Sequence, residues 1–185
     1  GSTLTTIGDS AFQNCIGIQS VIVPASVTTI GASAFQGTSL IDTVIPASVT
    51  FIGASAFQGL GVIIPNTTTT ISASLFLNTG IISVTFEDVS TLTTIGASAF
   101  QDCIGLTAIV VPVSVTSIGA SAFQGTSLID TVIPVSVTFI GANAFLELGV
   151  IIPNTTTTIS GSLFLNVGIT SVTFEDVSTL TTIGA

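Results

Sequence analysis

The sequence contains no Lys, Arg, His, Met, Trp or Tyr, while nine Asp and Glu residues give it a net charge of −9. Without a cationic side chain, the chain cannot neutralise phosphate groups, so binding to nucleic acids and attraction to anionic lipid surfaces are excluded. Without an imidazole or an amine side chain, the Ser-His, Cys-His, Ser-Lys and Schiff-base arrangements of many enzymes are excluded as well. We therefore expect a protein that is not an enzyme and needs no cofactor.

The sequence also lacks a long hydrophobic run, although 47% of its residues are hydrophobic. A membrane-spanning helix needs about 20 consecutive apolar residues. Here the apolar stretches are short, such as 21–23, and they end at Pro, Ser or Gly. The composition predicts a core that is divided into many small Ile and Val blocks, with no insertion into a membrane.

An internal repeat of 88 residues runs through the chain. Units 2–89 and 90–177 are identical at 72 of 88 positions. The segment Ser-Thr-Leu-Thr-Thr-Ile-Gly recurs at 2–8, 90–96 and 178–184. A unit of this kind buries its apolar side only against a neighbouring unit, so stacked units share one continuous core. We expect residues 1–185 to form a single repeat solenoid without caps, with the start of a third unit at 178–185.

Each unit contains four shorter repeats, or coils, of about 22 residues. Successive coils carry a Phe, at spacings of 23, 22, 19 and 24 residues in the first unit and into the second. Most coils also contain a β-branched run that ends in Pro, such as 21–24, which predicts a short strand that Pro terminates. The third coil is about three residues short, and the fourth replaces the Pro with the segment 84–90. Parallel strands about 4.8 Å apart would advance about 19 Å per unit along the solenoid axis.

These motifs closely resemble the BspA-like, or Treponema pallidum-type, leucine-rich repeat. The resemblance rests on Val-Pro-Val-Ser-Val-Thr-Ser-Ile-Gly-Ala-Ser-Ala-Phe at 111–123, on Phe-Gln-Asp-Cys-Ile-Gly-Leu at 100–106 and on the variant coil 84–96. It covers essentially the whole chain. It implies a β-rich, right-handed leucine-rich-repeat superhelix with short parallel strands, located outside the cell or on its surface. Such repeats serve in adhesion or as rigid stalks, and the resemblance implies no enzymatic activity.

A Thr stands two positions before the Ile of every coil. Hydrogen bonding within a Thr stack and β-propensity account for this position. The alternative is an ice-binding surface, which needs a flat and regular Thr array. We favour a structural ladder, because Phe51 and Phe139 interrupt the neighbouring file of Thr side chains once per unit. The ladder residues are Thr5, Thr28, Thr50, Thr69, Thr93, Thr116, Thr138, Thr157 and Thr181.

Phe51 and Phe139 are also candidates for a lateral contact surface. The core Phe of each coil lies elsewhere, so these two side chains are free to project from the solenoid, 88 residues apart. The alternative is that both fold into an adjacent groove.

Cys15 and Cys103 occupy equivalent positions in successive units, about 19 Å apart. A disulfide requires Cα atoms within about 7 Å, so these two residues cannot pair with each other. We expect both to be buried free thiols, and the alternative is a bridge between molecules. Two Cys residues alone have no metal-site spacing.

Asn66-Thr-Thr and Asn154-Thr-Thr match the N-glycosylation pattern, and each opens a run of four Thr. They are candidate glycosylation sites if the chain enters a secretory pathway. The carboxylates show no calcium-binding loop pattern, and the neighbours Glu87 and Asp88 should point to opposite faces of a strand end. We expect the carboxylates to be solvated and predict no metal site.

Together these features predict a non-enzymatic structural protein, a segment of an extracellular or cell-surface filament. Its partner would be itself, through end-to-end or lateral assembly of repeats that are nearly identical. The alternative is a cell-surface adhesin that binds a host or matrix protein. The coils are near-copies without Tyr, Trp or Arg, the residues enriched in binding hot spots, so the scaffold is favoured over the adhesin. Ice binding is the third and least favoured of these candidate functions.

Overall fold

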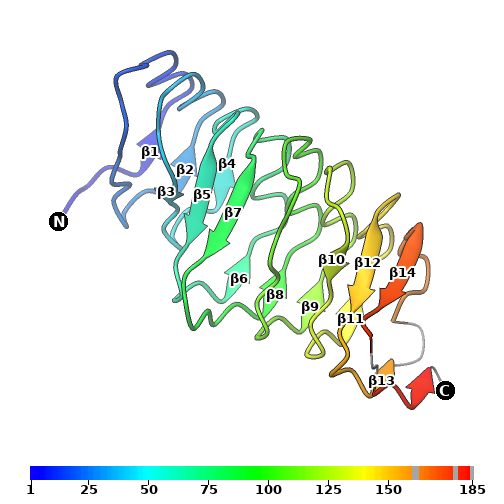
Figure 1. The fold of residues 1–185 in the computed structure, drawn as a ribbon. Helices are drawn as coiled ribbons and strands as arrows, with labels where there is room; N and C mark the ends of the chain where they lie inside the picture. Colours follow the sequence, from blue (N-terminus) through cyan, green and yellow to red (C-terminus); the bar gives the residue numbers. More distant parts are fainter. Residues whose placement is uncertain (160–162, 177–178, 184–185) are drawn as a thin grey trace.

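The computed structural model describes residues 1–159, 163–176 and 179–183, which wind into an elongated solenoid (Figure 1). The solenoid has about eight turns, spaced about 22 residues apart, and its strands pair in parallel. This architecture confirms the predicted repeat solenoid. Within the described ranges there is no helix long and apolar enough to cross a membrane.

The first file of strands consists of two-residue strands that each end in Ile. Pairing along the file is parallel and in register, with Thr6 beside Thr29 and Ile7 beside Ile30. From β1 to β13 the Ile side chains enter the core, and Ile30 and Ile95 are completely buried. The file comprises β1 (Thr6–Ile7), β2 (Thr29–Ile30), β4 (Phe51–Ile52), β6 (Thr70–Ile71), β8 (Thr94–Ile95), β9 (Ser117–Ile118), β11 (Phe139–Ile140), β13 (Thr158–Ile159) and β15 (Thr182–Ile183).

The second file of strands forms two separate three-stranded sheets, β3-β5-β7 and β10-β12-β14. Its side chains alternate between core and surface, since Val62 and Ile64 are buried while Ile63 between them is partly exposed. A Pro follows β3, β5, β10 and β12 within two residues and ends them, because it has no N–H to donate. The file comprises β3 (Thr43–Val44), β5 (Gly61–Ile64), β7 (Ser83–Phe86), β10 (Thr131–Val132), β12 (Gly149–Ile152) and β14 (Ser171–Phe174).

In each coil, the turn that links the two files carries the Phe that recurs once per coil. Two residues before the ring the backbone adopts a positive φ, 55° at Ser33, which costs about 1–2 kcal/mol for a residue other than Gly. Hydrogen bonds to the next coil offset this cost, for example from the Phe35 N–H to the Ala56 carbonyl at 3.0 Å. The fully buried rings are Phe35, Phe57, Phe76, Phe100, Phe123 and Phe145. Stacked neighbours have ring centroids 5.1–5.4 Å apart.

The short third coil changes the register between coils. In a regular coil the Ser33 N–H donates to the Ala54 carbonyl at 3.0 Å. In the short coil the Ser55 N–H donates to the Asn78 carbonyl at 2.8 Å, although Ala73 is the residue equivalent to Ala54. The same change of register, which we call the slip, recurs one unit later. The loss of residues between the two files therefore displaces the whole Phe turn of the following coil.

The strand pairing of the first file and the stack of Phe rings both stop at this slip. The first file ends one sheet at β4 and starts another at β6, which lies well below the line of β1, β2 and β4 in Figure 1. Among the described residues, no ring stacking joins Phe57 to Phe76. The second file continues across the slip, because β5 and β7 pair over four residues. The spacing of the Phe residues predicts the short coil, but not this break.

The stacked rings predict a large difference between core and surface Phe substitutions. Phe100→Ala removes a fully buried ring that stacks on both sides, so we expect the free energy of unfolding to fall by about 3–5 kcal/mol. Phe51→Ala removes a ring that is 56% exposed and is the matched control, with an expected change within about 0.5 kcal/mol. Urea unfolding followed by circular dichroism measures both, and equal losses would contradict the assignment.

Candidate contact surfaces

The predicted Thr ladder lies along the first file, with every member exposed. The side-chain hydroxyl of Thr116 donates to the carbonyl of Thr93 in the preceding coil at 3.2 Å, and other ladder members repeat this bond. The hydroxyl hydrogen is therefore used within the solenoid, and lone pairs remain for solvent. Among the described residues, Thr69 and Thr157 make no such bond to the coil before them. The ladder is thus interrupted at each short coil and forms no continuous flat array.

The two candidate contact residues Phe51 and Phe139 stand in the strands just before the interruption. Each ring is 56% exposed. The slip opens a groove of about 450 Å³ beside Phe51, and Leu77 and Asn78 line it as well. Phe51 therefore borders the groove without being buried in it. The exposure agrees with a projecting side chain, and the contact role stays a prediction.

Cys15 is exposed, and the prediction that both thiols are buried is wrong for this residue. Cys103 is fully buried because the preceding coil covers it with Phe76 and Thr79. In the described chain no coil covers Cys15 in the same way. The two residues have similar local sequences, so the difference in burial arises mainly from stacking.

The Cys103 thiol is held in an apolar, hydrogen-bonded site. Its Sγ donates to the Phe76 carbonyl at 2.9 Å, and the Thr79 Oγ1 lies 3.8 Å away. Burial raises the pKa of the Cys103 thiol from 9.0 to about 11. The thiolate, which is the reactive form, is therefore scarce at neutral pH.

Both candidate glycosylation residues lie in turns that follow second-file strands. Asn154 is exposed and Asn66 partly exposed. The Asn66 backbone N–H donates to Oε2 of Glu87 at 3.0 Å, and Asn154 makes the same bond to Glu175 at 3.1 Å. The glutamates therefore tie the turn of one coil to the strand end of the next, a role that the sequence pattern does not reveal.

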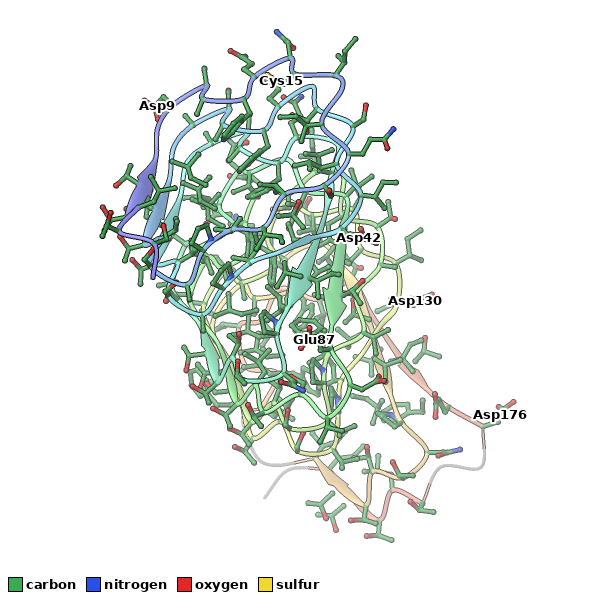
Figure 2. The ribbon with its side chains drawn as sticks, turned by 90° about the vertical axis from the view of Figure 1, so that its left-hand side faces the viewer. Asp9, Cys15, Asp42, Glu87, Asp130 and Asp176 are labelled. Carbon is green, nitrogen blue, oxygen red and sulfur yellow. The ribbon has the colours of Figure 1, made fainter. Side chains whose placement is uncertain are left out.

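The carboxylates are spread along the length of the solenoid, as the labelled Asp9, Asp42, Glu87, Asp130 and Asp176 show in Figure 2. Within residues 1–159, 163–176 and 179–183, no group of three or more His, Cys, Asp or Glu side chains could hold a metal ion.

An apolar groove at the junction of the two units is a feature that the sequence analysis missed. We call it the junction groove: it measures about 540 Å³ and is lined by β7 with Glu87 on one side and by Val110, Pro112 and Val113 on the other. A neighbouring groove of about 360 Å³ lies beyond Val113 and is lined by Val132 and Val135. The signal available in the sequence is the long spacing between Phe76 and Phe100.

A family model for the BspA type leucine-rich repeat region matches in several copies, over residues 1–91, 42–149 and 69–185. The chain belongs to the BspA-type leucine-rich-repeat family. This result confirms the resemblance found in the sequence motifs. No curated protein matches the sequence.

Two solved structures of bacterial leucine-rich-repeat proteins share the fold of this chain, and a third is reported beside them. A leucine-rich repeat protein from Bacteroides ovatus matches with a TM-score of 0.55 and 23% identity, over 98% of this chain and 55% of that one. The Treponema pallidum leucine-rich repeat protein matches with a TM-score of 0.54 and 24% identity, over 97% and 77%. A leucine rich cell surface protein from Faecalibacterium prausnitzii matches with a TM-score of 0.49 and 26% identity, over 98% and 61%. The chain thus spans little more than half of the Bacteroides ovatus protein.

The different burial of the thiols predicts different reactivity in this BspA-type solenoid. We expect Ellman's reagent at pH 8 to modify one thiol, Cys15, in the native protein and both thiols after unfolding in guanidinium chloride. The Cys15→Ser variant should show no rapidly reacting thiol, whereas Cys103→Ser should retain one. Rapid reaction of two thiols in the native protein would contradict the burial of Cys103.

The raised pKa of Cys103 also predicts a loss of stability at alkaline pH. Its protonated form stabilises the fold fully below pH 9, and this contribution is lost as the pH rises from 9 to about 11. We expect the free energy of unfolding to fall by about 2–3 kcal/mol over this range. The chain has no Lys, Arg or Tyr to titrate there, so a Cys103→Ser variant should show a clearly flatter pH profile. Identical profiles would contradict the expectation.

Proposed function

We propose that this chain is a segment of an extracellular or cell-surface structural filament built from stacked leucine-rich repeats, without enzymatic activity. The observation that carries the proposal is the continuity of strand pairing from one 88-residue unit to the next. β6 of the first unit pairs with β8 of the second, and Thr70 lies beside Thr94 in the register used within each unit. β13 and β15 repeat this pairing 88 residues later, with Thr158 beside Thr182.

Near-identity of the units supports the same function. Each unit presents the next with the same Ile, Phe and backbone groups, so stacking can continue without a specialised interface. End-to-end association of two molecules would use these same contacts. Phe12, which stacks on Phe35 and is 36% exposed, marks the face that such an association would cover.

The second candidate is a cell-surface adhesin that binds a host or matrix protein. The observation that favours it is the exposure of one Phe per unit, Phe51 and Phe139, on the side of the solenoid. Exposed aromatic side chains often mark interaction surfaces. The same residues would equally serve lateral contact between filaments, so the assembly state of the protein distinguishes the two functions.

Electron microscopy of the protein at increasing concentration tests the filament directly. We expect filaments longer than a single chain, with an axial repeat near 19 Å or a small multiple of it. Dispersed short particles at every concentration would reject the filament and favour the adhesin.

A pair of matched variants separates the modes of assembly. Phe12→Asp places a charge on the end face, while Phe51→Asp places the same charge on the side of the solenoid. End-to-end assembly predicts that Phe12→Asp shortens the filaments and Phe51→Asp leaves their length unchanged. The reverse result would assign the assembly to lateral contact.

A further inference from the structure

The second file of strands is broken at the junction of the two units. β7 is the last strand of the sheet β3-β5-β7, and the next sheet begins only at β10. Figure 1 shows a loop, without an arrow, between these two strands. This loop contains the segment 108–111, which occupies the place of a strand in its coil but pairs with neither sheet.

The segment 108–111 has the side-chain pattern of a strand without its hydrogen bonds. Ile109 and Val111 are buried, whereas Val110 between them is 83% exposed. Among the described residues, no backbone N–H or carbonyl of 108–111 has a hydrogen-bond partner. Unpaired backbone groups of this kind accept an added strand, as does the free edge of β7. The junction groove lies between these two sets of backbone groups.

The walls of the junction groove are more apolar than the equivalent surface of the first unit. Val113, which lines this groove, is 85% exposed, while the first unit carries Ala25 at the equivalent position. One of the differences between the units therefore adds apolar surface here, where it faces solvent. Exposed apolar side chains around a groove mark an interaction site.

Charge identifies the kind of partner. Glu87 lines the junction groove at the end of β7. The chain contains no Lys, Arg or His, so a second copy of it cannot supply a side chain of opposite charge. A cationic side chain opposite Glu87 must therefore come from a different protein.

We propose that the junction groove binds an extended segment of another protein, which adds a strand beside β7, places apolar side chains against Val110 and Val113, and sets a Lys or Arg beside Glu87. The unpaired backbone selects a polypeptide, the valines select alternating apolar side chains, and the carboxylate selects a cation. This proposal does not depend on filament formation, because the groove lies on the side of the solenoid.

Fluorescence anisotropy with the full chain and a labelled peptide, Lys-Val-Thr-Val-Thr-Val-Lys, tests the proposal. Two control peptides carry Glu in place of both Lys residues, or N-methyl groups on alternate residues that block strand pairing. We expect the lysine peptide to bind more tightly than either control. Its affinity should also fall with rising salt, because the charge pair is exposed to solvent.

Matched variants place the peptide in the junction groove. Val113→Ala gives the second unit the residue of the first, so the fold should tolerate it, and we expect about tenfold weaker binding. Val135→Ala makes the same change in the neighbouring groove and should leave binding unchanged. Glu87→Gln keeps an acceptor for the Asn66 N–H and should weaken binding of the lysine peptide about two- to fivefold.

Three results would overturn the proposal. The first is equal binding by Val113→Ala and Val135→Ala, and the second is tight binding of the N-methylated peptide. The third is a dimer in analytical ultracentrifugation that Val113→Ala dissociates, which would assign the groove to a second copy of the chain. None of these measurements depends on whether the protein forms filaments, so the two proposals fail separately.

Discussion

Each coil of this protein depends on the coil beside it, because a turn of about 22 residues has too few side chains to enclose a core of its own. Equivalent residues in the two units show this dependence. Phe100 is fully buried between two rings, whereas Phe12 stacks on one ring and is 36% exposed. Cys103 lies under Thr79, while Cys15 is exposed. The environment of a residue is therefore set by its neighbours along the axis as much as by its own coil.

Stacking of this kind requires a constant register, and the irregular features of the molecule lie where coil length changes. The short third coil moves the backbone partner of Ser55 to Asn78, and the first file and the Phe stack stop there. At the unit junction the segment 108–111 is left unpaired. The candidate contact sites, Phe51 and the junction groove, lie at these two places. Changes in coil length thus convert a uniform solenoid into one with localised surfaces.

The sequence predicts the solenoid well because its periodicity reports which residues face the core. The Phe spacing marks the coils, and the Ile of each first-file strand is buried as far as β13. The pattern could not predict whether adjacent backbones pair, because 108–111 keeps the alternation of a strand without its hydrogen bonds. It also assigned Cys15 and Cys103 the same burial, since local sequence contains no information on the coil that covers each one. Register and stacking are long-range properties, and the contact sites depend on both.

The absence of Lys, Arg and His has a structural consequence beyond the functions that it excludes. No ion pair between side chains can form within the chain, so adjacent coils are held by backbone hydrogen bonds, hydroxyl-to-carbonyl bonds and apolar packing. Glu87 illustrates this, because its carboxylate accepts a backbone N–H from Asn66 in the preceding coil. In the filament proposed above, the negative surface would repel further copies at the side of the solenoid, whereas stacking at its ends would use contacts that are independent of charge. For the proposed filament, this composition would favour growth along the axis over lateral association, and it agrees with the proposal that the side of the solenoid binds a partner of positive charge.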